Sequence, residues 1–177
     1  MPRIPYRDED DPKVADVVRV IRERRGGKLL NLDRMLIHSP NFARGWNSLL
    51  GAVRRELTLD AKSRELAICA VAKINKADYE WDHHLPHLLA AGATQQQVDA
   101  MNAGLDEASG NADLFDEKSL AALRVAIEMT RYVEVRPETL ARARKAFGDN
   151  ALVDLVGTVA AYNMVSRFLV ALGVEDE

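Results

Sequence analysis

Side chains that can exchange protons are concentrated in one stretch of the sequence, residues 63–92. Three of the chain's four histidines lie there, together with its one cysteine, a tyrosine and two glutamates. In chain order these residues are Glu65, Cys69, Tyr79, Glu80, His83, His84 and His87. Glutamate and histidine form common acid–base pairs, because imidazole has a reference pKa of about 6.5 and exchanges a proton near neutral pH. The stretch therefore predicts proton-transfer chemistry.

The spacing of apolar residues in this stretch predicts two helices joined by a short break. From Leu66 onward, apolar residues recur at intervals of three and four, which is the spacing of one helix face. Asn75 is a plausible stop for this first helix. The second helix is expected to begin near Ala77 and to end at Gly92, because glycine is a natural C-terminal cap.

Helical geometry then places the candidate acid–base residues near one another. Glu80 and His84 are four residues apart, so they lie on the same face of the second helix. His83 and His87 form a second pair with the same spacing. If the two helices pack antiparallel, Glu65 faces His84 and holds its ring in one tautomer.

A family resemblance rests on the same stretch. The sequence RELAICAVAKINKADYEWDHH, followed by AAGAT, resembles the carboxymuconolactone decarboxylase family, which includes the alkylhydroperoxidase-D-like proteins. The upstream segment NFARGWNSLLGAVRRELTLDAKSRE and the C-terminal segment AAYNMVSRFLVALGVE are similar to that family as well. The resemblance covers most of the chain after about residue 38. It implies an all-helical bundle that assembles as a trimer or a hexamer.

The hydroperoxidase-type members carry a glutamate, a Cys-x-x-Cys pair and a histidine. On this chain the glutamate corresponds to Glu65 and the histidine to His84. The two cysteine positions hold Ala77 and Glu80, and Tyr79 stands between them where the family often has histidine. Peroxide reduction in these enzymes needs an attacking thiolate and a resolving thiol. With one cysteine the chain cannot form an intramolecular disulfide, so the sequence excludes a dithiol peroxidase of this type.

The resemblance implies a cofactor-independent lyase that acts on a small carboxylated lactone or a related organic acid. In the namesake reaction carbon dioxide leaves and the electrons flow into the lactone carbonyl, which requires a hydrogen-bond donor and a proton source. The candidate catalytic residues are Glu65, His84, Glu80 and Tyr79, with His84 as the acid and Glu65 as its orienting base. The candidate substrate-binding residues are Arg44, Trp46, Arg64, Trp81 and His83. One of the two arginines would hold the substrate carboxylate in its planar fork.

Two other classes of function stay open at this point. One is a relative of the alkylhydroperoxidase-D-like proteins that has lost its redox thiols and binds a small ligand or a partner. The other is a metal-dependent enzyme, because Glu80, His84 and His87 have the helical spacing of metal ligands. Pro86 argues against the metal site, since a proline inside a helix removes a backbone hydrogen bond and kinks it.

Composition narrows the class of protein further. The chain has 177 residues, 47% of them hydrophobic and 29% charged, which is typical of a soluble globular protein. A formal net charge of -3 gives no basic footprint for nucleic acid. No membrane partner and no cofactor are expected, because no signal-like segment, glycine-rich phosphate loop or Schiff-base motif is visible. A single cysteine, Cys69, fits a small core residue in a reducing compartment, so a cytoplasmic location is the default.

The remaining sequence predicts an all-α frame. Residues 1–12 are expected to form an extended arm, and residues 13–177 a single helical domain. Helix ends are expected at Gly26 and Gly148, and helix starts at Ser39 and Asn150. Thr94 and Gln97 form a predicted capping box, and residues 102–119 a long surface loop. The last helix is apolar on nearly every face, which favours burial in a homo-oligomer.

Overall fold

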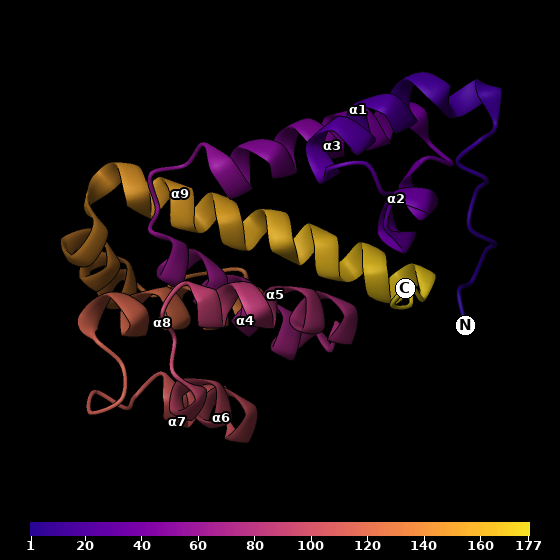
Figure 1. The fold of residues 1–177 in the computed structure, drawn as a ribbon. Helices are drawn as coiled ribbons and strands as arrows, with labels where there is room; N and C mark the ends of the chain where they lie inside the picture. Colours follow the sequence, from indigo (N-terminus) through magenta and orange to yellow (C-terminus); the bar gives the residue numbers. More distant parts are fainter. The chain divides into compact units, whose positions relative to one another are not determined.

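The computed structural model describes all residues from 1 to 177, and every regular element in it is a helix (Figure 1). The prediction of an all-α protein is confirmed. The chain forms two compact units, the first made of Met1–Glu56 with Phe168–Glu177 and the second of Leu57–Arg167. The expectation of a single domain from residue 13 stays a prediction.

The first unit contains a short 3-10 helix and three α-helices. These are η1 (Pro12–Val14), α1 (Ala15–Arg25), α2 (Asn31–Leu36) and α3 (Pro40–Arg55). α1 ends at Gly26, which has a φ of 78° in the left-handed region that glycine adopts without strain. Ser39 occupies the N-cap position of α3, although its side chain makes no capping hydrogen bond.

Residues before Pro12 form no helix and are held by the C-terminal segment of the same unit. The backbone N–H of Arg3 donates to the carbonyl oxygen of Leu172 at 2.8 Å. The hydroxyl of Tyr6 accepts a hydrogen bond from the backbone of Glu175 at 3.0 Å. The amino group of Met1 also forms an ion pair with Glu175. The extended arm is therefore tied to the end of the chain.

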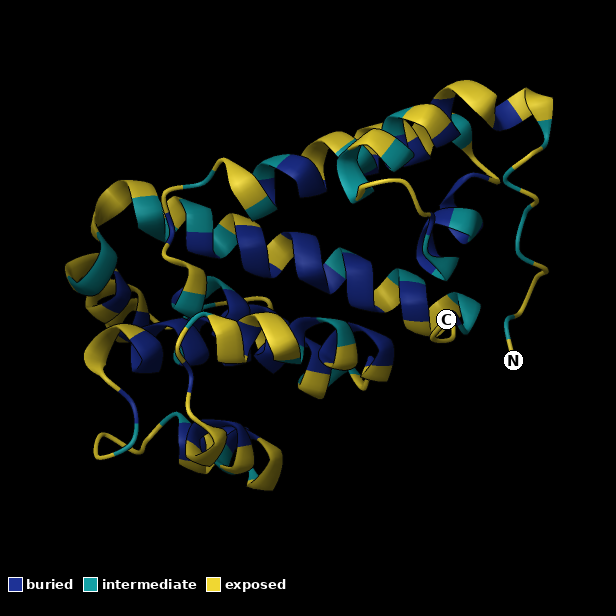
Figure 2. Cartoon of the chain, in the orientation of Figure 1, coloured by how far each residue is buried: buried dark blue, intermediate teal, exposed yellow.

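The second unit is built around α4, which is buried on nearly all sides. Its helices are α4 (Ala61–Asn75), α5 (Asp78–Ala90), α6 (Gln95–Ala103), α7 (Leu105–Ala108), α8 (Glu117–Tyr132) and α9 (Pro137–Leu172) as far as Arg167. α4 packs against α5 and α8. Every residue of 66–72 is at most 1% exposed (Figure 2). Alanines recur on both α4 and α8, and such small side chains let two helix backbones approach closely.

The boundaries of α4 follow from local chemistry. Asp60 caps its N-terminus by accepting a hydrogen bond from the backbone N–H of Ser63 at 2.9 Å. The helix ends at Asn75 as predicted, and Lys76 follows with a left-handed φ of 55°. α5 begins only two residues later, at Asp78. This tight connection turns α4 and α5 into a helical hairpin.

The predicted helix boundaries hold at some positions and fail at others. The capping box of Thr94 and Gln97 is present at the start of α6. The predicted surface loop 102–119 is wrong in part, since it contains α7, whose Leu105 and Ala108 are buried apolar residues. The polar residues around these two positions obscured the apolar spacing that would have predicted this short helix.

α9 also departs from the predicted boundaries. The backbone of Gly148, with φ 75° and ψ 172°, leaves the helical region, so the predicted interruption falls where expected. Helical segments lie on both sides of this kink, as the prediction of a separate last helix requires, but Asn150 lies inside the second segment and not at its cap. Glycine alone accommodates this backbone conformation without strain, so one residue is sufficient for the break.

α9 is the one helix long and apolar enough to cross a membrane by length and composition. Its most apolar window has a mean hydropathy of 1.5, and half of that window is buried within the protein. A buried core helix has the same composition, so this feature is weak evidence for a membrane span. The expectation that the chain has no membrane partner stays a prediction.

Candidate functional site

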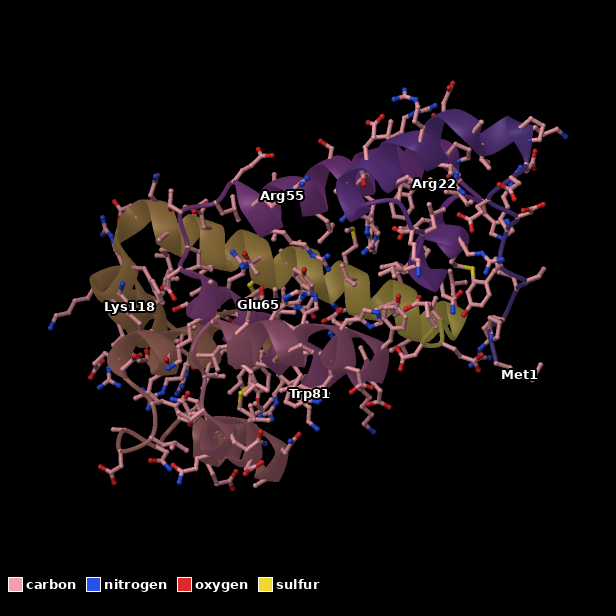
Figure 3. The ribbon with its side chains drawn as sticks, viewed as in Figure 1. Met1, Arg22, Arg55, Glu65, Trp81 and Lys118 are labelled. Atoms are coloured by element: carbon pink, nitrogen blue, oxygen red, sulfur yellow. The ribbon has the colours of Figure 1, made fainter.

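Glu65 on α4 and His84 on α5 are in direct contact inside the second unit. The imidazole Nδ1 of His84 lies 2.7 Å from Oε2 of Glu65. Both residues are buried, each with 4% of its surface exposed. Figure 3 labels Glu65 among the side chains of the protein. The α4–α5 hairpin produces this contact, as the antiparallel arrangement expected from the sequence requires. The catalytic role of the two residues stays a prediction.

The protonation state of Glu65 decides which ring nitrogen of His84 carries hydrogen. Burial is the largest influence on the Glu65 carboxyl and raises its pKa, but the hydrogen bond and charge of His84, aided by Arg64, lower the pKa overall. Glu65 is therefore ionised at neutral pH and can only accept hydrogen bonds. Nδ1 of His84 must then be the protonated donor in this contact.

Arg64 supports the carboxylate on its other oxygen. Its Nε donates to Oε1 of Glu65 at 3.1 Å, so each oxygen of Glu65 accepts a hydrogen bond from a side chain. This contact makes Arg64 part of the support for Glu65. Its predicted role as the binding group for a substrate carboxylate stays a prediction.

Two residues of α9, Tyr162 and Ser166, contact side chains of α5. The ring of Tyr162, which is fully buried, meets the His84 ring edge-on, with 4.9 Å between the centroids and 88° between the planes. One turn later, Ser166 Oγ lies 2.9 Å from Oε1 of Glu80 and 2.9 Å from the carbonyl oxygen of Tyr162. A hydroxyl has one proton, so Ser166 donates to one of these two acceptors at a time.

The sequence analysis singled out neither Tyr162 nor Ser166 as a candidate site residue. Their four-residue spacing within AAYNMVSRFLVALGVE was the signal, since it puts both on one face of the helix. Their partners on α5 could not be read from that spacing.

The other candidate residues on α5 pack against their neighbours. The ring of Tyr79 stacks on that of His83 at 4.1 Å, and Nδ1 of His83 lies 2.8 Å from the carbonyl oxygen of Tyr79. The ring of Trp81 is 9% exposed and has the ammonium group of Lys73 4.7 Å from its centroid. His87 is exposed at the surface of α5.

Two of the predicted substrate-binding residues, Arg44 and Trp46, belong to the first unit. Arg44 is exposed on α3 and donates to Asn41 at 3.0 Å. Trp46 is buried and packs against Phe42 and Phe168, with ring centroids 5.7 Å and 5.3 Å away. The predicted role of these two residues in substrate binding stays a prediction.

The single cysteine lies in the interior next to the candidate site. Cys69 is fully buried on α4. Burial, with the negative charges of Glu65 and then Glu80, raises the pKa of its thiol strongly. A thiol in this environment stays protonated and is a poor nucleophile.

The predicted metal alternative finds no support in the arrangement of side chains. No group of three histidine, cysteine, aspartate or glutamate side chains is placed to hold a metal ion. The rings of His84 and His87 are 6.0 Å apart between centroids and tilted by 59°. α5 continues through Pro86 as one helix, so the proline does not separate the two histidines into different elements.

Comparison with known families agrees with this arrangement. The model of the carboxymuconolactone decarboxylase family matches residues 40–128, just over half of the 177 residues. The chain belongs to the carboxymuconolactone decarboxylase family, as the sequence resemblance indicated. The matched region contains both Glu65 and His84. A search of curated proteins found no match.

Solved structures show the same fold at low sequence identity. An alkylhydroperoxidase AhpD core protein from Ralstonia eutropha, called an uncharacterized peroxidase-related protein, is 20% identical with a TM-score of 0.81, covering 99% of this chain and 92% of its own. A peroxidase-related protein from a Silicibacter species is 17% identical with a TM-score of 0.80, covering 99% and 92%. A variant of the debrominase Bmp8, bound to 2,3,4-tribromopyrrole, is 16% identical with a TM-score of 0.77, covering 99% and 91%. These similarities confirm the alkylhydroperoxidase-D-like fold.

Proposed function

We propose that this protein is a cofactor-independent enzyme that transfers a proton to a small organic acid, with decarboxylation of a carboxylated lactone as the leading reaction. The observation that carries the proposal is the buried 2.7 Å contact between Glu65 and His84. An ionised glutamate that fixes one tautomer of a histidine is a common way to prepare a general acid or base. Membership of the carboxymuconolactone decarboxylase family supports the reaction class.

In the proposed reaction, the bond between the substrate and its carboxylate breaks and carbon dioxide leaves. The electron pair of that bond passes through the double bond onto the lactone carbonyl oxygen, which gives an enolate. His84 in its imidazolium form then delivers the Nε2 proton to carbon, and solvent restores that proton. Glu65 stabilises the imidazolium before transfer and holds the ring in place afterwards. A buried site favours the reaction by removing water from the departing carboxylate.

The experiment is an assay of purified protein against a panel of carboxylated lactones and related acids, with carbon dioxide release and substrate loss both recorded. We expect turnover of at least one substrate and a fall of about a hundredfold or more in His84→Ala, the usual contribution of a general acid. His87→Ala is the matched control, because His87 is an exposed histidine one turn away on the same helix. Equal losses in the two variants, or no turnover across the panel, would contradict the proposal.

A second candidate is a family member that binds a small ligand without catalysis. Two observations favour it: the family's cysteine positions hold Ala77 and Glu80, and the thiol of Cys69 is buried and protonated. The debrominase variant bound to a brominated pyrrole is a fold relative that takes up a small aromatic molecule. Saturable binding of a panel compound with no chemical change, unaffected by Glu65→Gln, would favour this candidate over the enzyme.

A further inference from the structure

A pocket in the first unit is lined mainly by cationic side chains. It lies between the C-terminal turns of α1 and α3 and has a volume of about 250 Å³. Its lining residues are Arg24, Arg25, Lys28, Leu30, Leu50, Gly51, Arg54 and Arg55. We call this site the basic pocket. Five of its eight residues are lysine or arginine, and none is acidic.

Arg24 is a buried charge in this pocket whose hydrogen bonds are incomplete. Its side chain is 8% exposed. Nε donates to the side-chain oxygen of Asn47, whereas Nη2 is buried without a hydrogen-bond partner, 3.7 Å from Oδ1 of Asp33. A buried guanidinium N–H normally has an acceptor, and the nearest one here, the equally unpartnered Oδ1 of Asp33, lies beyond hydrogen-bond distance, so Nη2 keeps a free donor for a ligand.

The positive charge of the pocket exceeds the negative charge around it. Asp33, 1% exposed, forms ion pairs with Arg24 and Arg25. Lys28 and Arg55 are exposed, and neither has a carboxylate within ion-pair distance. The C-terminal ends of α1 and α3 add roughly half a negative charge each through their dipoles. Arg24, Arg25, Lys28 and Arg55 carry four positive charges, and Asp33 with the two helix ends offsets about two of them. About two positive charges therefore stay uncompensated, even without counting Arg54.

Burial and the neighbouring cations make the charged form of Arg24 less favourable. Burial, followed by the charge of Arg25, lowers the pKa of Arg24 to about 10, against the opposing effect of Asp33. The positive charges of Arg24 and Arg25 therefore lie close together in a partly desolvated site. A bound anion would stabilise them there.

Gly51 keeps the space between two of the arginines open. A Cβ atom at this position would lie 3.6 Å from Nη2 of Arg55 and 3.8 Å from Cδ of Arg24. The glycine thus leaves room for a group to sit between the two guanidinium groups.

We propose that the basic pocket binds a tetrahedral phosphate dianion, either free inorganic phosphate or the terminal phosphate of a small metabolite. Guanidinium forks match the oxygen spacing of phosphate and donate two hydrogen bonds each. The charge of the dianion matches the uncompensated positive charge. A volume of about 250 Å³ holds a phosphate group, so the rest of a metabolite would extend into solvent.

The test is isothermal titration of the full chain with inorganic phosphate, glycerol 3-phosphate and acetate at equal ionic strength. We expect one-to-one binding of at least one of the two phosphates, and at least tenfold weaker binding of acetate. Tighter binding of glycerol 3-phosphate assigns the site to a metabolite, and tighter or equal binding of inorganic phosphate assigns it to the free ion. Acetate binding as strong as phosphate, or no phosphate binding at up to about 10 mM, would overturn the proposal.

Variants locate the site. Arg55→Gln and Lys28→Gln change exposed residues of the pocket, so the fold should survive, and each should raise the Kd for phosphate about fivefold or more. Arg19→Gln is the matched control, because Arg19 is an exposed arginine of α1 that pairs with Glu23 instead. An unchanged Kd in both pocket variants, or an equal loss in the control, would remove the site from this pocket. The readout is binding, so its result is independent of the proposed enzyme activity.

Discussion

Two of the three buried glutamates of the second unit, Glu65 and Glu128, have similar burial and different partners. Their exposed fractions are 4% and 6%. In both, burial raises the pKa of the carboxyl but hydrogen bonds from neighbouring side chains lower it overall. Both carboxylates accept from an arginine, and the difference lies in the other donors: Glu65 faces a histidine, whereas Glu128 faces a threonine and a backbone N–H.

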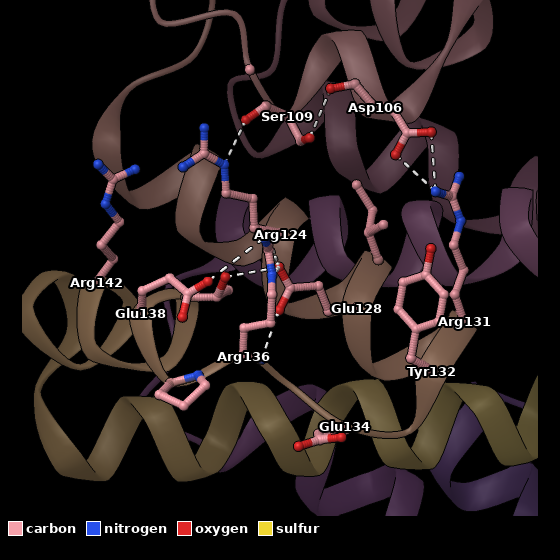
Figure 4. Close-up of a pocket in the computed structure, with 14 residues that line it drawn as sticks. Asp106, Ser109, Arg124, Glu128, Arg131, Tyr132, Glu134, Arg136, Glu138 and Arg142 are labelled. Carbon is pink, nitrogen blue, oxygen red and sulfur yellow. Dashed lines mark hydrogen bonds and ion pairs between the residues drawn. The ribbon is translucent and has the colours of Figure 1, made fainter.

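Glu128 is saturated by donors that do not titrate near neutral pH. Arg136 donates its backbone N–H to Oε2 at 2.9 Å, and its Nε and Nη2 to Oε1 at 2.9 and 2.5 Å. The hydroxyl of Thr139 adds a bond of 2.8 Å to Oε1. This network holds the connection between α8 and α9 beside a cavity of about 930 Å³ (Figure 4).

The comparison teaches that burial and a lowered pKa do not by themselves mark a catalytic carboxylate. Glu128 stabilises a turn, and its partners keep their charge from pH 5 to pH 9. The partner of Glu65 is a histidine, the side-chain type whose ordinary pKa lies near neutral pH. The titrating partner is therefore the feature that singles out Glu65 and His84 as the candidate site.

The largest expected effect is the loss of turnover when the pair is broken. Glu65→Gln keeps the side-chain volume and removes the charge, so turnover on a substrate from the panel should fall about tenfold or more. The double variant Glu65→Gln with His84→Ala should be little slower than His84→Ala alone, since both residues serve one proton path. The wild type, the two single variants and the double variant form a double-mutant cycle. Turnover and melting temperature are measured for each of the four proteins. Strictly additive losses of turnover would mean that the two residues act independently. Losses that follow the melting temperature would mean that their role is structural.

The next largest effect is a loss of stability when the hydrogen bonds of Glu128 are removed. Glu128→Gln removes charge-assisted hydrogen bonds, and we expect it to lower the free energy of unfolding by about 1–2 kcal/mol, the value being reduced because Arg136 is exposed. Turnover per folded molecule should not change. Glu138→Gln is the control, because Glu138 contacts the same arginine from an exposed position. Urea denaturation measures both, and a larger loss in the control would reject the role of Glu128.

The smallest effect is the acid dependence of stability. Both glutamates have a folded-state pKa below the ordinary value of 4.5. A carboxyl of this kind stabilises the fold above its unfolded pKa, and the contribution is lost as the pH falls through the folded pKa. The stability difference between the wild type and Glu128→Gln should therefore be constant above about pH 5 and shrink at lower pH. A difference that grows towards acid would mean that the pKa of Glu128 is raised.

Sequence reasoning recovered the local features of the fold. Apolar spacing predicted the helices, and caps such as the Thr94–Gln97 box predicted where one begins. The Glu65–His84 contact could be expected because a hairpin fixes which residues of two adjacent helices meet. Each of these depends on residues close together in the chain.

Features that depend on distant residues were not predictable from spacing. The contact of Ser166 with Glu80 joins residues from opposite ends of the second unit. The basic pocket combines the ends of α1 and α3, whose cations read individually as ordinary last-turn residues. α7 was missed because two apolar residues among polar ones carry little periodic signal.

The tight connection at Lys76 has a consequence for the chain entropy of the candidate site. The Glu65–His84 contact closes a segment of only 19 residues, whereas the Glu80–Ser166 contact closes one of 86. Loop-closure entropy grows with the logarithm of segment length, so the longer closure costs about 1 kcal/mol more. The ordering cost of bringing the acid–base pair together is thus kept low by two residues between helices, one of them held in a left-handed conformation.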